Sequence, residues 1–213
     1  FRRRDSALRH KRILIVEARM ALDTNIAQYD APEKDLYEIG EIPPMGYVPK
    51  QMYAWTIRRE RHGNPNTAML EEVVDVPTLD SHEVLVLVMA AGVNYNGVWA
   101  ALGKPISPVD GHKQPFHIAG SDASGIVWAV GDKVKRWKIG DEVVIHCNQD
   151  DGDDEHCNGG DPMYSPSQRI WGYETPDGSF AQFTNVQAQQ LMPDSLSLAP
   201  LTRKWRPSIK TPE

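Results

Sequence analysis

The sequence predicts a mainly β fold, a small irregular β-barrel with short helices. Short runs rich in β-branched and aromatic residues recur along the chain, at residues 52–59, 69–76, 83–92, 124–131, 141–146 and 179–186. Gly and Pro, sixteen of each, separate these runs with turn signals. Helical periodicity is scarce and indicates one short helix, over residues 96–102. Strands this short and this closely spaced favour a barrel over alternating strands and helices.

The individual runs differ in character. Residues 52–59 are aromatic and β-branched, and the turn His62-Gly63-Asn64-Pro65 separates them from residues 69–76, which alternate partly. Residues 83–92 are almost continuously apolar, which predicts a strand covered on both faces. Residues 179–186 are the last clear strand.

The composition divides the chain into four parts. Residues 1–30 are an N-terminal extension unlike the rest, and residues 31–51, rich in Pro and Gly, are an extended arm that leads into the first strand. Residues 52–193 contain the strands. Residues 194–213 combine three prolines and four basic residues with no periodicity, so we expect a disordered tail.

The net charge of −6 is unevenly distributed. Residues 1–30 carry seven Lys and Arg against four Asp and Glu, whereas residues 31–193 carry twelve against twenty-three. This acidic body argues against a nucleic-acid-binding surface, which needs a basic face. No apolar run approaches the roughly 18 residues of a membrane span. Residues 7–22 are basic and amphipathic but lack a cleavage pattern, so we expect a cytoplasmic protein without nucleic-acid or membrane partners.

The sequence argues against a metal site. Two cysteines, Cys147 and Cys157, cannot build a four-cysteine zinc site. The pairs His146-Cys147 and His156-Cys157 lie ten residues apart, a spacing that gives poor ligand geometry within one loop. The acidic residues before Cys157 lack the ordered ligand spacing of an EF-hand. A solvated loop is the better prediction for residues 150–157.

Three segments could carry chemistry. Asn94 and Asn96 follow the run 83–92, and their amides could face a carbonyl or carboxyl oxygen, although two Asn at a strand end can also simply build a turn. The small residues 120–125 (GSDASG) indicate either a close backbone approach or a strand-entry turn. Tyr173 and Glu174 place a carboxylate beside aromatic residues, where partial desolvation would let it orient a water, although most such Glu are merely solvated.

These segments, in this order, resemble the GroES-like catalytic domain of the medium-chain dehydrogenase/reductase superfamily. Within it, about residues 33–193 are similar to the bacterial crotonyl-CoA carboxylase/reductases. The likeness rests on residues 90–99 (AAGVNYNGVW), 117–155 (beginning HIAGSDASGIVW), 168–183 (QRIWGYETPDGSFAQF) and 190–193 (QLMP), and the arm 34–49 matches as well.

The resemblance implies reductive carboxylation of crotonyl-CoA with CO₂ and NADPH, giving ethylmalonyl-CoA. In that family an Asn amide, an aromatic–Glu pair and a His hold CO₂ directly or through water. By position, this implies catalytic roles for Asn94 or Asn96, for Tyr173 and for Glu174, and the choice between the two Asn stays open. The resemblance also implies a homo-oligomer for the complete enzyme.

The resemblance further implies an enzyme without zinc. Zinc alcohol dehydrogenases of the superfamily place a Cys at the position of Asn94 and a His at the position of Ser121, and neither ligand is present here.

The chain departs from the family at both ends. The family continues after the QLMP segment into a helix and a Rossmann domain, which also supplies its His, whereas this sequence continues as DSLSLAPLTRKWRPSIKTPE. No G-x-G-x-x-G motif is present to bind a dinucleotide. We therefore expect an incomplete GroES-like domain, with the Rossmann domain absent, that is inactive as an isolated chain. A natural short protein and a truncated or frame-shifted piece both stay open.

Two other functions stay open. The chain could belong to a zinc-independent enoyl-CoA or quinone reductase, or it could be a non-catalytic GroES-like interaction module. Glu174 together with the two Asn favours carboxylation over plain reduction, because such groups would serve CO₂ and not hydride transfer.

Overall fold

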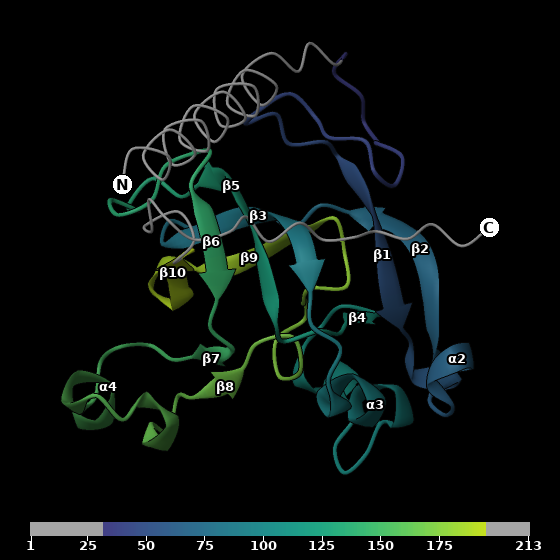
Figure 1. Cartoon of the computed structure of the whole chain (residues 1–213). Coiled ribbons are helices and arrows are strands. Elements are labelled where there is room, and N and C mark those ends of the chain that lie inside the picture. The colour runs from purple at the N-terminus through teal and green to yellow at the C-terminus, as the bar shows by residue number, and fades with distance from the viewer. Residues whose placement is uncertain (1–31, 195–213) are drawn as a thin grey trace, which may run out of the picture.

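Antiparallel strands dominate the computed structural model, which describes residues 32–194 (Figure 1). The strands are β1 (Gln51–Ile57), β2 (Met69–Asp75), β3 (Glu83–Ala91), β4 (His117–Ile118), β5 (Ala123–Val130), β6 (Glu142–Ile145), β7 (Asn148–Gln149), β8 (Arg169–Ile170), β9 (Phe183–Gln187) and β10 (Leu191–Pro193). A three-stranded sheet has the order β2-β1-β4, and a five-stranded sheet has the order β10-β6-β5-β3-β9. Strands β7 and β8 form a separate ribbon.

The helices are short. They are α2 (Pro65–Ala68), α3 (Tyr95–Leu102) and α4 (Glu155–Gly159), with 3-10 turns η1 (Arg59–Arg61), η2 (Pro108–Gly111), η3 (Pro162–Tyr164) and η4 (Ala188–Gln190). The prediction of a mainly β fold with short helices is confirmed, and α3 matches the helix expected at residues 96–102. None of the helices in residues 32–194 is long and apolar enough to cross a membrane.

Strand β1 connects the two sheets. Besides pairing with β2 and β4, it forms a bridge between Ala54 and Ala181, and the Trp55 N–H donates to the Phe180 carbonyl over 2.8 Å. The chain runs from this contact directly into β9, at one edge of the five-stranded sheet. The sheets therefore form one curled surface, as expected of an irregular barrel.

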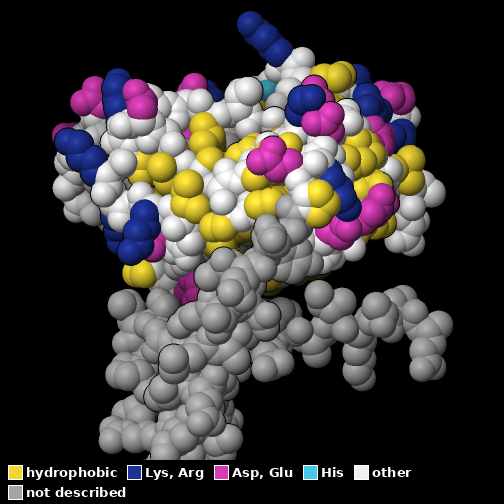
Figure 2. Space-filling model, turned by 90° about the horizontal axis from the view of Figure 1, so that it is seen from above, with side chains coloured by type: hydrophobic (Ala, Val, Ile, Leu, Met, Phe, Trp, Pro, Cys, Tyr) yellow, Lys and Arg dark blue, Asp and Glu magenta, His cyan; other side chains and the backbone are white. Residues whose placement is uncertain are grey.

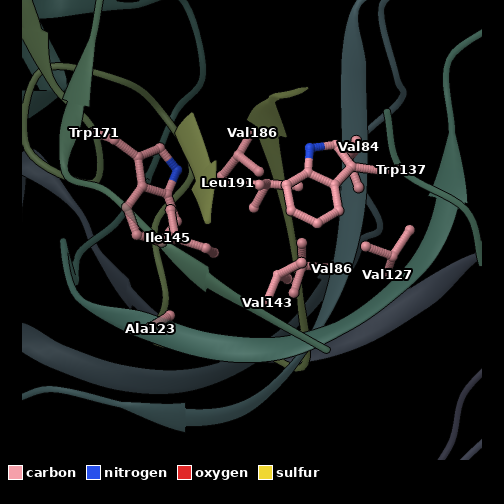
Figure 3. Packing of buried hydrophobic residues seen from close by; sticks show 10 residues of the cluster. All are labelled: Val84, Val86, Ala123, Val127, Trp137, Val143, Ile145, Trp171, Val186 and Leu191. Carbon is pink, nitrogen blue, oxygen red and sulfur yellow. The ribbon is translucent and has the colours of Figure 1, made fainter. Parts of the chain in front are cut away.

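Apolar side chains on the inner faces of the sheets form the core. Figure 3 shows one cluster, in which Trp137 and Trp171 flank aliphatic side chains from β3, β6, β9 and β10. The Trp137 indole N–H donates to the Ala188 carbonyl over 2.8 Å, so this ring is buried without losing its hydrogen bond. A second cluster surrounds Trp128 and Phe183, whose ring centroids are 6.2 Å apart.

Strand β3 is buried on both faces only in its first half. Residues 84–87 are buried, but Met89 is 44% exposed, so the expectation of complete burial over 83–92 is wrong for the second half. The reason is the length of its neighbour: β9 pairs with Glu83 to Leu87 and no further, whereas β5 follows β3 to Ala91.

The arm before β1 is docked onto the sheets. Residues 32–50 contain no helix or strand, as expected of an extended arm. The Trp128 indole N–H donates to the Tyr47 carbonyl over 2.7 Å, and the Gln182 amide donates to the Tyr37 carbonyl over 3.1 Å. The predictions for residues 1–30 and for the tail from 195 onward lie outside the described residues.

Several elements differ from the sequence prediction. The last strand was expected at 179–186, but β9 covers 183–187, because residues 178–180 pack against the backbone around Gly120. The two- and three-residue strands β4, β7, β8 and β10 are too short for a periodic signal. Helix α4 begins within the segment 150–157 that was predicted as a solvated loop, because the Asp154 carboxylate caps it by accepting from the N–H groups of His156 and Cys157.

The face seen in Figure 2 carries apolar side chains among charges of both signs. Lysine and arginine do not gather there into one basic area.

A carboxylate between two arginines links the β1–β2 pair to η1. Glu72 on β2 accepts hydrogen bonds from Arg58 over 2.6 Å and from Arg61 over 2.5 Å, and its side chain is 22% exposed. The hydrogen bond from Arg58 is the main cause that lowers the pKa of Glu72 to about 2. The ionised carboxylate therefore stabilises the fold.

We expect Glu72→Gln to lower the free energy of unfolding by about 2 kcal/mol, because a half-buried charged pair is replaced by weaker neutral bonds. The depressed pKa means that the stabilisation is complete above about pH 4.5 and is lost as the pH falls towards 2. Urea unfolding at pH 7 and pH 3 measures both effects. The exposed neighbour Glu71→Gln is the control, and an equal loss in both variants would contradict the assignment.

Candidate active site

Two segments with predicted site residues cross with their backbones in contact. Gly172 has φ +73°, and a Cβ atom there would lie 2.0 Å from the Gly120 carbonyl oxygen. A Cβ at Gly178 would lie 2.6 Å from the same oxygen. Only glycine permits this approach. The crossing places the turn that carries Tyr173 and Glu174 directly against the GSDASG segment.

We expect Gly172→Ala to destabilise the chain by more than about 4 kcal/mol, because the methyl group would overlap main-chain atoms that cannot move aside. Gly40→Ala is a matched control: Gly40 has φ +91°, but nothing lies within 4 Å of the added Cβ. That substitution should cost only about 1 kcal/mol. Thermal unfolding of both variants separates the effect of the steric overlap at Gly172 from the effect of a positive φ, which both positions share. Equal losses of stability in the two variants would contradict the close approach of Gly172 to Gly120.

The GSDASG segment also contacts the first predicted Asn. Asn94 precedes α3, and its side-chain oxygen accepts from the Asn96 N–H over 2.9 Å. Its side-chain nitrogen donates to the Ser121 hydroxyl over 3.1 Å and to the Asp122 carboxylate. Asn94 therefore builds a helix cap, and this cap connects α3 to the crossing.

The second predicted Asn is arranged differently. Asn96 lies in the first turn of α3 and is half-buried, and its side-chain amide has no hydrogen-bond partner among the described residues. It keeps two donors and an acceptor for another group.

The hydroxyl of Tyr173 is committed to a neighbouring loop. It donates to the carbonyls of Ile106 and Lys104 over 3.2 Å and 3.4 Å, and the ring packs against a cluster that contains Ala100 and Ala119. Burial, followed by the nearby Glu174 charge, raises the pKa of Tyr173. The residue is a neutral wall that joins the turn to the end of α3.

Glu174 is exposed, so of the two alternatives left open by the sequence, a solvated carboxylate fits the structure and a partly desolvated one does not. One carboxylate oxygen accepts from the Ile170 N–H over 2.7 Å, which folds the side chain back over its own turn. The other oxygen accepts no hydrogen bond from the described residues. It can accept one from a water molecule or a protonated group.

The structure thus brings the four predicted residues into one connected arrangement. A Cβ at Gly172 would lie 3.2 Å from the Ser121 N, and the Ser121 hydroxyl accepts from Asn94. Tyr173 and Glu174 follow Gly172 directly. Asn96 joins through the cap, because its N–H donates to Asn94. No hydrogen bond links either Asn directly to Tyr173 or Glu174 within residues 32–194.

A buried histidine forms a hydrogen bond to the turn that contains Gly172. The His117 side chain is fully buried, and its Nε2 lies 3.2 Å from the Gly172 carbonyl oxygen. Burial, with a smaller contribution from His112, lowers the pKa of His117 to about 3. The ring is therefore neutral near pH 7, and Nε2 must carry the proton that it donates. Sequence reasoning missed His117, because no local motif distinguishes it from a core histidine.

The same turn ends at a buried carboxyl group. Asp177 is 6% exposed, and one oxygen accepts from the Gln114 amide over 3.3 Å. Burial raises the pKa of Asp177 to about 6. A proton on this carboxyl group therefore stabilises the folded state.

Because the folded-state pKa is raised, the stabilisation is complete below about pH 4 and is lost as the pH rises through 6. We expect Asp177→Asn to remove this loss, so that its stability relative to the wild type rises by about 2 kcal/mol between pH 4 and pH 7.5. Urea unfolding at both pH values tests this. The exposed control Asp132→Asn should run parallel to the wild type, and a parallel curve for Asp177→Asn would contradict the assignment.

The acidic loop contains one small cluster of ligand-type side chains. Within the described residues, Asp151, Asp154 and Cys157 are the only group of three whose ligand atoms lie within 4.8 Å of one another. The Asp154 carboxylate already caps α4 and accepts from the Ser165 hydroxyl, and the Ser165 bond is the main cause that lowers the pKa of Asp154 to about 2. Its hydrogen bonds explain the cluster without a metal ion.

The fold corresponds to a known domain. The alcohol dehydrogenase GroES-like domain family matches residues 80–196, more than half of the sequence. The chain belongs to this family. Alcohol dehydrogenases and a quinone oxidoreductase are among the more distant relatives, at 34% identity.

Among curated proteins, the crotonyl-CoA carboxylase/reductase of Cereibacter sphaeroides is 82% identical over 175 residues. The match covers 81% of this chain and 41% of that protein. The crotonyl-CoA reductase of Streptomyces avermitilis is 39% identical, over 67% of this chain and 34% of that protein. The chain therefore spans about two-fifths or less of the length of these relatives.

Solved structures agree with this assignment. A crotonyl-CoA carboxylase/reductase superposes with a TM-score of 0.76 at 71% identity, covering 78% of this chain and 39% of that one. The crotonyl-CoA carboxylase/reductase AntE in complex with NADP gives 0.71 at 52% identity, over 78% and 42%. The 2-octenoyl-CoA carboxylase reductase CinF, in complex with NADP and 2-octenoyl-CoA, gives 0.65 at 35% identity, over 69% and 38%.

Proposed function

We propose that this chain forms the GroES-like part of an NADPH-dependent crotonyl-CoA carboxylase/reductase. The observation that carries the proposal is the crossing of Gly120 and Gly172, which gathers the Asn94–Asn96 cap and the Tyr173–Glu174 turn at one place. The 82% identity to the Cereibacter sphaeroides enzyme supports the same assignment. Homo-oligomerisation of the complete protein and its cytoplasmic location stay predictions.

The proposed reaction joins CO₂ to a reduced thioester. NADPH, when bound, supplies the hydride that reduces the β-carbon of crotonyl-CoA. Residues 32–194 contain no glycine-rich turn between a strand and a helix, so no residue of this part is assigned to the cofactor. The α-carbon of the resulting enolate forms a bond to the carbon of CO₂, which gives the carboxylate of ethylmalonyl-CoA. The described residues would hold CO₂ and exclude water, so that carboxylation is faster than protonation.

Asn96 is the better candidate to hold a CO₂ oxygen. Both N–H groups of the Asn94 amide already donate, to Ser121 and Asp122. The Asn96 amide is free within the described part of the chain, and its N–H groups can donate to an oxygen that becomes negative as the new bond forms. We therefore assign substrate contact to Asn96 and the cap to Asn94.

We assign Glu174 the role of binding a water molecule or a protonated group of the substrate. The oxygen that is not bound to Ile170 remains open, and exposure at the surface of this domain allows another domain to cover it. The backbone bond holds the carboxylate in one orientation, which is useful for positioning a bridging water. Tyr173 supplies the apolar wall beside it.

Zinc does not fit this site. The superfamily positions for a Cys and a His ligand hold Asn94 and Ser121, and their side chains hydrogen-bond to each other over 3.1 Å. A neutral amide nitrogen and a hydroxyl are not the thiolate, imidazole or carboxylate ligands that zinc requires. We propose a zinc-independent reaction.

The assignment is tested by the distribution of products. In a full-length chimera, residues 33–194 would replace the matching segment of the Cereibacter sphaeroides enzyme. The chimera would be supplied with NADPH, crotonyl-CoA and bicarbonate, and the products ethylmalonyl-CoA and butyryl-CoA would be quantified. We expect Glu174→Ala to lower the ratio of carboxylated to reduced product by about 10-fold or more, while NADPH oxidation falls much less. Glu155→Ala, at an exposed position on α4, is the control. Equal loss of both products would favour a plain enoyl-CoA reductase.

A further inference from the structure

Asp122 is a charged residue whose side chain contacts the cap of α3, and the site described above gives it no role. It follows Ser121 in the GSDASG segment, and its carboxylate accepts a hydrogen bond from the Asn94 side-chain nitrogen. Its side chain is exposed, so packing in the core does not explain why this position is acidic.

The hydrogen bonds determine how the Asn94 amide is oriented. An ionised carboxylate only accepts, so the NH₂ group must face Asp122. A backbone N–H only donates, so the amide oxygen must face Asn96. The reversed amide would place an oxygen against the carboxylate and an NH₂ group against an N–H. The Asp122 carboxylate and the Asn96 N–H therefore favour the same orientation, in which Asn94 caps the helix.

Asp122 is itself held in place. Its carbonyl accepts from the Gly92 N–H over 2.8 Å, and a Cβ added at Gly92 would lie 2.7 Å from the Asp122 Cβ. The side chain thus occupies the space above Gly92, at the end of β3. Since Asn94 lies two residues beyond Gly92, the carboxylate meets its partner without a flexible linker.

We propose that Asp122 is a positioning residue: its carboxylate fixes the Asn94 amide and thereby sets the first turn of α3, from which Asn96 reaches the site. This proposal rests on the function proposed above, since Asn96 is assigned to CO₂ there. Loss of the carboxylate should let the Asn94 amide rotate and should misplace Asn96, while the domain remains folded. The expected result is a change in product ratio that is larger than the change in stability.

Exchange of the two side chains gives a sharp test. Asp122→Asn removes the charge, and Asn94→Asp keeps a capable helix cap but places two carboxylates side by side. The double variant Asn94→Asp/Asp122→Asn restores one amide and one carboxylate with the donor and acceptor exchanged, and the Ser121 hydroxyl can then donate to the carboxylate. In the full-length chimera, each single variant should lower the ratio of ethylmalonyl-CoA to butyryl-CoA about tenfold, and the double variant should recover to within about threefold of the wild type.

Matched controls separate this effect from general damage. Asp132→Asn makes the same chemical change at an exposed turn just beyond the other end of β5 and should leave the ratio unchanged. Thermal unfolding of every variant shows whether the ratio changes without a loss of folding. Equal ratios in the wild type and Asp122→Asn, or a double variant no better than the worse single variant, would overturn the proposal.

A measurement on this chain alone keeps the two proposals distinguishable. In ¹⁵N NMR spectra, the side-chain NH₂ protons of Asn94 should exchange with solvent more slowly than those of the exposed Asn66, and Asp122→Asn should reduce the difference, since only the bond to Ser121 remains. If the chimera makes no ethylmalonyl-CoA but Asn94 shows this protection, the proposed function fails and the role of Asp122 in setting the cap stands. If Asn94 is unprotected in the wild type, the role of Asp122 fails whatever the chimera produces.

Discussion

The close approach of Gly120 and Gly172 is the constraint on which the site depends. The two segments are about fifty residues apart in the sequence and come from different parts of the fold, the entry to β5 and the turn after β8. No side chain separates them, so the turn lies directly over Ser121. His117 then holds the Gly172 carbonyl from below. A side chain at Gly172 would collide with the Gly120 backbone, and one at Gly120 would collide with Ser179 and Phe180.

Around this crossing, the hydrogen bonds divide the polar groups into two kinds. Asn94, Ser121 and the Tyr173 hydroxyl are committed to partners within the domain. The side-chain amide of Asn96 and one oxygen of Glu174 have no hydrogen-bond partner among residues 32–194. The hydrogen-bonded residues hold the unbonded polar groups in position. Little reorganisation is therefore needed when a substrate binds. Proteins named crotonyl-CoA carboxylase/reductase match this part of the chain at 52% to 82% identity.

The sequence predicted the fold class, most of the longer strands and α3, whereas the roles of the site residues stay predictions. Those predictions succeeded where the signal was local: the aromatic and β-branched residues of β1, the apolar run of β3 and the short helical pattern of α3. The orientation of Asn94 and the role of Asp122 depend on contacts between residues about thirty positions apart, which no local pattern encodes. The burial of Asp177 and His117 has the same origin. Helix α4, in contrast, could have been predicted, because Asp154 and Gly160 are recognisable cap residues.

A crystal structure of the full-length chimera with NADP and crotonyl-CoA would test the central claim most directly. The account predicts that Asn94 keeps its bonds to Ser121 and Asp122, and that the free amide of Asn96 and the Glu174 carboxylate lie on the side of the thioester α-carbon. A structure in which Asn94 has left Asp122 and faces the thioester, with Asn96 turned away, would contradict it.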